Sequence, residues 1–490
     1  RREARPLPSM PSPLAELHFS SPHQQTGGLV HFSPDGRLVA CAAAYRLVVR
    51  DVETLEIVHI FSCKDVIEKI EWSRDSKYVL CGIFKRGVAQ IWSVEQPEWY
   101  CNVDEGPIGL ACVRFSPGGR HVLATADFQL RITVWSLLDR SVCYIRFPKF
   151  TEAGLDFSPD GRMMALAERR DGKDSAALFE CDGWTALRSF PVATEDLADL
   201  RWSPDSTVLC VIDSVLQYQV LFYSVEGACL HSYRPCEPAL EHGLGVKSCS
   251  WSPGGRYLAL GSFDEKARLL NHLTWRRIAE CDHPSEVRAS DFPAAVCYVE
   301  PEESLSGVLA DSGDANALSL AAAPGGQKRP TGYVARRPPL TVATLVPSFE
   351  PEQAARQGVG LLRWSAAGRF LASRSDAMPC ALWIWDASTF GLHAVLLQQQ
   401  PVSAIAWHPT QELLAVCSGS AKLFLWSPGG CRTAPLPSEA SFRLTAMEWS
   451  STGGALLLLD RDRFCMCFLA GGDPAVDAGG PQASSRAPPP

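Results

Sequence analysis

Short runs of apolar residues recur along most of the chain, bounded by turns rich in Ser, Pro, Asp and Gly. One phrase marks these turns: an aromatic residue, Ser, usually Pro, then Asp or Gly and a basic residue, as at 32–37, 157–162 and 251–256. The aromatic residues that begin its nine copies are Phe32, Trp72, Phe115, Phe157, Trp202, Trp251, Trp364, Trp407 and Trp449. Seven of the eight intervals between them span 40 to 49 residues, and the eighth spans 113. Nine phased copies indicate a repeat architecture.

Each copy predicts one antiparallel sheet of four short strands. The first strand ends at the aromatic residue, and Pro-Asp-Gly then forms a tight turn, because Pro fixes φ and Gly accepts unusual backbone angles. A second apolar strand follows, as at 38–42, and a third ends in an aromatic and a polar residue, as at 91–93. One such sheet cannot bury its faces alone, so neighbours stack around a central axis. We therefore predict an all-β, WD40-type β-propeller rather than an irregular β-sandwich.

The number of blades is less tightly specified than the fold. Nine repeats fit a single large ring or two fused propellers, and we favour one continuous assembly of about nine blades. The last repeat lacks an outer strand, and proteins avoid open sheet edges. We therefore expect residues 14–19 to close the ring by pairing with residues 464–469.

Composition divides the chain into two runs of repeats. Residues 14–283 hold repeats one to six, and residues 358–470 hold repeats seven to nine. Residues 284–357 between them are rich in Ala, Pro, Gly and Ser, which is typical of a low-complexity insertion. The apolar fragments 295–299 and 340–346 within it are candidate strands of a degenerate tenth blade.

Both ends of the chain read as disordered. Residues 1–13 are basic and Pro-rich, without the apolar stretch of a secretory signal, and residues 471–490 are rich in Gly, Pro and Ala. No apolar run approaches the length of a membrane span. We expect no membrane insertion.

Charge and cysteine content narrow the function classes. The net charge of −8 argues against a nucleic-acid partner, which favours a basic surface. The 18 cysteines are scattered and mostly lie in apolar runs, so we interpret them as buried reduced thiols rather than metal ligands. No phosphate-binding loop, nucleophile elbow, metalloprotease or kinase motif is present. We predict a non-enzymatic protein without cofactor or metal.

Particular phrases go beyond the generic repeat and carry a family resemblance. They are residues 45–52, 95–99, 130–137, 165–171, 271–275 and 425–431. With them the chain resembles the WD repeat-containing protein 8 family from about residue 29 to residue 469, whereas residues 1–28 and 284–357 match poorly.

The resemblance implies a scaffold of the cytoplasm and cytoskeleton, at centrosomes, centriolar satellites and spindle poles. It implies roles in microtubule minus-end anchoring, mitotic spindle organisation and cilium assembly. The implied partners are a coiled-coil anchoring protein and, in fungi, a minus-end-directed kinesin.

Candidate binding residues lie between the second and third predicted strands of their blades, where aromatic and Arg side chains are the usual interface anchors. The alternative is that such loops are solvated turns with internal ion pairs. The candidates are Tyr45, Arg46, Lys85, Arg86, Phe128, Glu168, Arg169, Arg170, Asp171 and Phe263. Aligned by blade, they predict one partner-binding surface on the rim, with Asp264 bracing its own turn.

Two other function classes stay open. An enzyme with a site in the channel needs clustered acidic, His or Cys residues on the first strands, where His31 stands alone. A scaffold of another pathway would resemble a translation initiation factor or a ubiquitin-ligase substrate receptor. The receptor class often shows Trp-Asp-x-Arg after a third strand, and residues 385–388 break that pattern.

Overall fold

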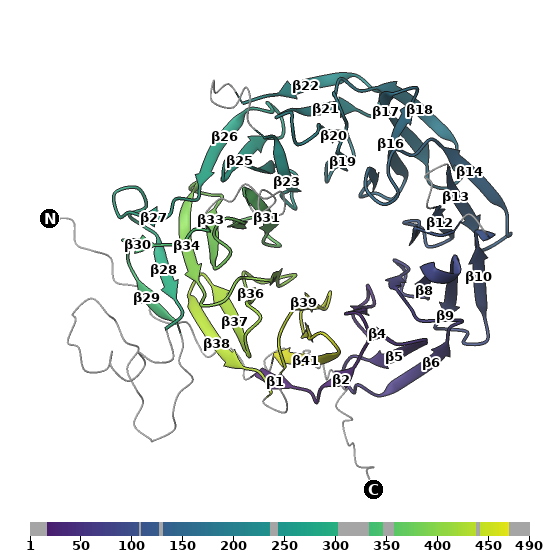
Figure 1. The fold of residues 1–490 in the computed structure, drawn as a ribbon, viewed down its shortest axis with the longest axis horizontal. Helices are drawn as coiled ribbons and strands as arrows, with labels where there is room; N and C mark the ends of the chain where they lie inside the picture. Colours follow the sequence, from purple (N-terminus) through teal and green to yellow (C-terminus); the bar gives the residue numbers. More distant parts are fainter. Residues whose placement is uncertain are drawn as a thin grey trace, which may run out of the picture.

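The computed structural model describes residues 17–106, 109–126, 131–235, 244–301, 333–345, 357–437 and 442–469. These residues form nine blades in one closed ring (Figure 1). Their regular structure is β-strand throughout, apart from one short 3-10 helix, η1 (Phe84–Arg86). The predicted all-β propeller is confirmed, and its nine blades belong to a single ring rather than to two fused propellers.

Blades 1 to 6 follow one another along the chain, each with four antiparallel strands in sequence order and the first strand nearest the axis (Figure 1). Blades 1 to 3 comprise β3 (Val30–Phe32), β4 (Leu38–Ala43), β5 (Arg46–Asp51), β6 (Ile57–Ser62), β7 (Lys69–Trp72), β8 (Tyr78–Ile83), β9 (Val88–Ser93), β10 (Tyr100–Asp104), β11 (Cys112–Phe115), β12 (His121–Thr125), β13 (Arg131–Ser136) and β14 (Val142–Arg146). Blades 4 to 6 comprise β15 (Leu155–Phe157), β16 (Met163–Arg170), β17 (Lys173–Glu180), β18 (Ala186–Pro191), β19 (Asp199–Trp202), β20 (Val208–Ile212), β21 (Val220–Ser224), β22 (Cys229–Tyr233), β23 (Val246–Trp251), β24 (Tyr257–Ser262), β25 (Lys266–Asn271) and β26 (Arg277–Asp282).

Blades 7 to 9 complete the ring. Blades 7 and 8 comprise β31 (Val359–Trp364), β32 (Phe370–Ser375), β33 (Ala381–Asp386), β34 (Gly391–Leu397), β35 (Ala404–Trp407), β36 (Leu414–Cys417), β37 (Lys422–Ser427) and β38 (Gly430–Pro435). Blade 9 comprises β39 (Ala446–Trp449), β40 (Ala455–Leu459), β41 (Arg463–Leu469) and the N-terminal strands β1 (Leu17–Phe19) and β2 (His23–Gln24).

The aromatic residue of each repeat is the last residue of its blade's innermost strand. Five of these residues are tryptophans whose indole N–H donates to a backbone carbonyl on the innermost strand of the preceding blade, at 3.1–3.2 Å: Trp72, Trp202, Trp364, Trp407 and Trp449. The sixth tryptophan, Trp251, has a buried indole N–H without a partner. The repeated aromatic residue therefore joins consecutive blades by packing and, in five cases, by a hydrogen bond.

The repeated turn is stabilised by its own polar side chains. In blade 1 the Ser33 hydroxyl donates to Asp35 at 2.5 Å and accepts from the backbone N–H of Leu38 at 2.9 Å. Gly36 takes a φ of 73°, a conformation that favours glycine. Blade 2 has Ser76 at the equivalent position, and its hydroxyl accepts from the Asp35 N–H at 3.0 Å. Hydrogen bonds therefore join the turns between first and second strands from blade 1 to blade 2, as well as stabilising each turn within its blade.

The two ends of the repeat region meet in blade 9. Leu17, His18 and Phe19 pair antiparallel with β41, and β2 continues along the same strand. The expected closure by residues 14–19 is confirmed for residues 17–19, and residues 14–16 lie outside the described residues. Ser20 adds two hydrogen bonds to Met466, both at 2.9 Å. Every blade in the ring therefore has a paired outer strand.

Blade 7 is wider than the others. Strand β28 (Val296–Val299) pairs parallel with β34, and β29 (Val334–Arg336) pairs with β28, so this sheet has six strands (Figure 1). Strand β27 (Glu286–Val287) pairs with β30 (Leu340–Thr341) in a separate ribbon. The two fragments that were candidates for a tenth blade are thus strands, but they extend blade 7 and form this ribbon.

Candidate partner-binding face

We define the rim face as the side of the ring that carries the turns between second and third strands and the connections from one blade to the next. Hydrogen bonds place both sets of loops together in blade 1. The Cys63 N–H donates to the Tyr45 carbonyl at 2.8 Å, and the Ile67 N–H donates to the Ala44 carbonyl at 3.0 Å. The predicted binding residues within the described chain therefore lie on one face, and Phe128 lies outside the described residues.

In blade 1 the candidate side chains are open to solvent. Tyr45 is 46% exposed, and the Arg46 guanidinium lies 5.5 Å from the centre of its ring. Exposed aromatic and Arg groups of this kind are suited to protein interfaces.

In blade 2 the candidates are tied to the neighbouring connection. The Arg86 Nε lies 2.7 Å from Asp65, and this hydrogen bond lowers the pKa of the Asp65 carboxyl. The backbone N–H of Lys85 donates to Glu68 at 3.0 Å, and Lys85 itself is exposed. Lys85 is therefore the freer of the two cations.

Strands β16 and β17 form the longest hairpin of second and third strands in the described blades, with eight residues in each strand. Its tip is Asp171-Gly172, where φ is 53° at Asp171 and 74° at Gly172. Positive φ at both residues matches the two-residue turn that suits a twisted hairpin. The predicted cluster Glu168 to Asp171 lies at this tip. The hairpin therefore carries charged side chains along its end on the rim face.

Arg169 is held by an ion-pair network rather than left free. Its Nε lies 2.9 Å from Asp174 and its Nη2 lies 2.8 Å from Asp196. Lys149 joins the same two carboxylates at 2.8 and 2.6 Å, and the side chains of Lys149 and Asp174 are only 4% and 3% exposed. The hydrogen bond from Lys149 is the main cause that lowers the pKa of Asp196. Arg169 therefore positions the hairpin against the blade 4 to blade 5 connection.

Arg170 points to the other side of the hairpin. Its guanidinium lies 4.4 Å from the centre of the Phe147 ring, and Phe147 is 40% exposed. Phe147 has a φ of 65°, and its carbonyl accepts from the Arg169 N–H at 3.2 Å. A positive φ is a strained conformation for a bulky residue. Glu168 is half-buried, and burial raises its carboxyl pKa. Of the predicted cluster, Arg169, Arg170 and Asp171 are exposed, and Arg169 is the one held by ion pairs among the described residues.

In blade 6 the candidate aromatic residue is partly enclosed. The ammonium of Lys247 lies 5.2 Å from the Phe263 ring, and the backbone of Phe263 leaves no room for a Cβ at Gly358. Asp264 accepts from Ser262 at 2.5 Å and from the fully buried Arg268 at 2.6 Å. Asp264 therefore braces its turn, as expected.

Sequence reasoning missed a second aromatic and basic group on blade 3. The Arg131 guanidinium lies 4.3 Å from the centre of the Tyr144 ring, and Tyr144 is exposed. Arg146 is the cross-strand partner of Arg131 and is followed directly by Phe147. The available signal was the close spacing of Tyr144, Arg146 and Phe147, which was not recognised because these residues lie on the outer strand and directly after it rather than between the second and third strands.

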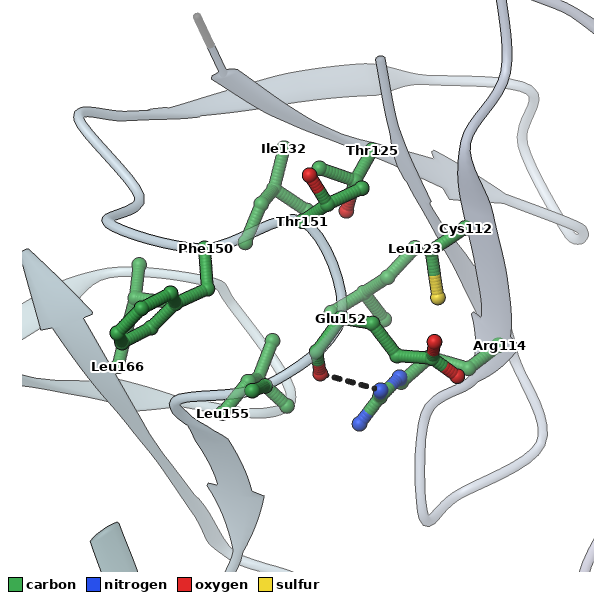
Figure 2. Close-up of a pocket in the computed structure, with 11 residues that line it drawn as sticks. Cys112, Arg114, Leu123, Thr125, Ile132, Phe150, Thr151, Glu152, Leu155 and Leu166 are labelled. Atoms are coloured by element: carbon green, nitrogen blue, oxygen red, sulfur yellow. Dashed lines mark hydrogen bonds between the residues drawn. The ribbon is translucent and has the colours of Figure 1, made fainter. Parts of the chain in front are cut away.

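Figure 2 shows a small pocket between blades 3 and 4, lined by residues from β11 and from the connection between the blades. Arg114 donates from its Nη2 to the backbone carbonyl of Glu152 at 3.0 Å, and Phe150 and Leu155 form an apolar wall (Figure 2). Cys112 and Glu152 lie in the lining, which contains no histidine (Figure 2).

Other features of the described residues bear on the remaining predictions. His31, the lone channel histidine, lies 3.2 Å from Glu448. No group of three or more His, Cys, Asp or Glu residues in the described ranges is arranged to hold a metal ion. Burial raises the pKa of several thiols, that of Cys41 to about 11. No helix in the described part of the chain is long and apolar enough to cross a membrane.

Comparison with known proteins agrees with this architecture. The family "WD domain, G-beta repeat" matches residues 227–271 and 389–427. The C-terminal WD40 domain of Sif2 has a similar fold, with a TM-score of 0.50 and 10% identity over 94% of this chain and 100% of that one. An uncharacterised WD repeat-containing protein of Schizosaccharomyces pombe is 23% identical over 83% of this chain and 77% of its own length.

The family assignment rests on a mouse relative. WD repeat-containing protein WRAP73 of Mus musculus is 44% identical over 453 residues, which cover 92% of this chain and 96% of the relative. The resemblance inferred from the sequence is thereby confirmed as that of a WD-repeat protein, whereas its identification with WD repeat-containing protein 8 stays a prediction. The chain belongs to the WD repeat-containing protein WRAP73 family.

Proposed function

We propose that this protein is a non-enzymatic scaffold at the centrosome, centriolar satellites and spindle poles. There it supports microtubule minus-end anchoring, mitotic spindle organisation and cilium assembly. The observation that carries this proposal is the 44% identity to mouse WRAP73 along nearly the whole of both chains, together with the centrosomal family that the sequence phrases resemble. Its location is the cytoplasm and the cytoskeleton.

The proposed mode of action is protein binding by the rim face. A closed ring of stacked blades is rigid, and its loops present side chains without a large conformational cost. The proposed contact residues are the accessible candidates Tyr45, Arg46, Lys85 and Arg170. Arg169 contributes by fixing the hairpin that presents Arg170.

The proposed partners are a coiled-coil anchoring protein of the centrosome or spindle and, in fungi, a minus-end-directed kinesin. An interface of this kind is centred on aromatic and Arg anchors surrounded by weaker polar contacts. Nucleic acid is not a proposed partner, since the chain carries a net charge of −8.

Proximity labelling in dividing cells tests the proposal. The full chain is fused to a biotin ligase, and the ligase alone serves as the control. We expect enrichment of pericentriolar and spindle-pole proteins over the control. Enrichment of ribosomal proteins or of ubiquitin-ligase subunits, without pericentriolar proteins, would contradict the proposal and favour a scaffold of another pathway.

A further inference from the structure

Two arginines on neighbouring blades share an unusual arrangement. Arg131 stacks on Tyr144 and Arg170 stacks on Phe147, with guanidinium-to-ring distances of 4.3 and 4.4 Å. Stacking on a ring occupies the flat face of a guanidinium and leaves the N–H groups along its edge free to donate. Within the described residues, neither arginine forms an ion pair with a carboxylate. Each therefore presents an ordered set of donors that no carboxylate of the described residues meets at ion-pair distance, although the charge of Arg170 acts on the nearby Glu168 carboxyl.

The two stacked pairs are joined into one strip. Arg131 lies opposite Arg146 in the β13–β14 ladder, and Phe147 follows Arg146 in the chain. Arg170 lies opposite Lys173 at the hairpin tip. We call this set of residues the arginine strip: Arg131, Tyr144, Arg146, Phe147, Arg170 and Lys173. It runs from the outer part of blade 3 to the tip of the blade 4 hairpin.

Two other rim-face arginines, Arg169 and Arg86, provide a contrast. Arg169 directs its donors to Asp174 and Asp196, and Arg86 directs Nε to Asp65. These side chains are occupied by structural ion pairs. The arginine strip is the part of the described rim face where several cations lie together with aromatic rings in place of carboxylates.

The hairpin that carries the strip is fixed in position. The nearly inaccessible pair of Lys149 and Asp174 anchors it to the neighbouring connection. The Phe147 backbone is held at a φ of 65°. This conformation costs free energy and persists only where the surroundings enforce it. A fixed set of donors binds an anion with little loss of side-chain entropy.

The charges of the arginine strip and of the whole chain indicate which kind of anion the strip binds. The strip carries four cations, and its acidic neighbours are the half-buried Glu168 and the turn residue Asp171. The chain as a whole carries a net charge of −8, which repels extended polyanions such as nucleic acids and anionic membranes. A short, flexible acidic peptide meets the local positive charge and avoids most of this repulsion. The exposed rings of Tyr144 and Phe147 offer apolar contact beside the charges.

We propose that the arginine strip binds an extended, carboxylate-rich segment of a partner protein. Carboxylates of that segment accept paired hydrogen bonds from Arg131 and Arg170, the geometry to which a guanidinium edge is suited. The inference deepens the proposed function, on which it rests, by naming the part of the rim face that is used and the chemistry of what it binds.

Fluorescence anisotropy of the full chain tests this inference. The probe is a short fluorescein-labelled peptide in which Glu alternates with Ser, and a matched peptide carries Gln in place of Glu. The strip variant is Arg131→Gln/Arg170→Gln. The matched control is Arg162→Gln/Arg256→Gln, which loses the same charge from exposed turns on the opposite face. Thermal melts verify that both variants fold.

We expect the Glu peptide to bind and the Gln peptide not to bind, with binding weakened as salt is raised. The strip variant should bind the Glu peptide about tenfold more weakly, and the control should change by less than about twofold. Arg170→Lys should give an intermediate loss, because it keeps the charge but loses the flat fork. Equal weakening in both double variants would overturn the inference, since it would then reflect net charge alone.

Two further arms distinguish other anions. A labelled single-stranded oligonucleotide and phosphatidylserine vesicles are titrated under the same conditions, and binding of either more tightly than the Glu peptide would overturn the inference. The proposed function is tested separately by proximity labelling. Pericentriolar labelling without peptide binding would refute only the proposal for the arginine strip. Absence of pericentriolar labelling would refute the proposed function, even if the peptide binds.

Discussion

Removal of the N-terminal closing strand should destabilise the whole ring. Deleting residues 1–21 removes β1 and Ser20, and with them the pairs of Leu17, His18 and Phe19 with β41. Ser20 also makes two hydrogen bonds to Met466. Leu17 and Phe19 pack against the core between blades 8 and 9. The deletion thus removes the longer of the two N-terminal strands that pair with β41 and leaves only β2 to close the ring on that edge.

The magnitude follows from these contacts. Hydrogen-bonded pairs alternate along an antiparallel ladder, so the β1 pairing supplies about two backbone hydrogen bonds and Ser20 two more, each with a net value of about 1 kcal/mol. The loss of about 4 kcal/mol is a large part of a typical free energy of unfolding. For a chain of this size it corresponds to a fall in melting temperature on the order of 5–10 °C.

Differential scanning calorimetry and hydrogen exchange provide the assay. The matched control deletes residues 1–13 only, which the sequence predicts to be disordered, and should leave the melting temperature within about 2 °C of the full chain. In the full chain, residues 17–19 should exchange as slowly as interior strands. Fast exchange there, or equal melting temperatures of the two deletions, would refute closure by strand exchange.

Three further predictions follow from the fold. Trp449→Phe removes the indole bond to the Ala406 carbonyl and should cost about 1 kcal/mol more in urea denaturation than Trp251→Phe, whose indole N–H has no partner; equal losses would argue against inter-blade hydrogen bonding. Burial lowers the pKa of His283 to about 4, so the unfolded chain binds the extra proton first, and the free energy of unfolding should fall by roughly 3 kcal/mol as the pH drops from about 6.5 towards 4. His283→Gln should reduce this pH dependence, and an unchanged slope would show that His283 does not contribute. Replacing residues 304–330 with a short Gly-Ser linker should change the melting temperature by less than about 2 °C in calorimetry, whereas a large loss would mean that the segment contributes to the core.

The hydrogen bonds of His283 explain why its neutral form is stable. The ring Nδ1 lies 2.8 Å from the Glu265 carbonyl. A carbonyl can only accept, so Nδ1 carries the proton. The Ser373 hydroxyl accepts from the Trp385 indole at 2.8 Å and can donate to the His283 Nε2 at the same distance. A second ring proton, on Nε2, would displace the hydrogen bond from Ser373, and the resulting positive charge would be fully buried.

The ring was predictable because its information is local and repeated. Each aromatic residue, such as Trp407, marks the end of an innermost strand, and the turn that follows is stabilised by residues next to it in sequence. The closing strand was predictable because an unpaired β41 edge would be costly. The addition of β28 to blade 7 was not, since parallel pairing with β34 joins residues about a hundred positions apart and belongs to no repeat.

The face on which the candidate residues lie was predictable from the sequence, but the contacts that their side chains make were not. Arg169 and Arg170 are adjacent and chemically equal in the sequence, yet they point to opposite sides of β16. Arg169 meets Asp196, a residue from another blade connection, and Arg170 meets Phe147. Repeat periodicity places a turn on a face, whereas these contacts depend on how two blades pack.

The most direct measurement of the central claim is the localisation of the protein in mitotic cells that lack the endogenous copy. The full chain carries a fluorescent tag and is compared with Arg170→Glu/Lys173→Glu on the rim face and Arg162→Glu/Arg256→Glu on the opposite face, at equal protein levels. We choose Lys173 rather than Arg169 because reversing Arg169 would also break the ion pairs that hold the hairpin. The account predicts that the wild type and the opposite-face variant accumulate at spindle poles and that the rim-face variant does not. Absence of the wild type from the poles, or normal accumulation of a folded rim-face variant, would contradict it.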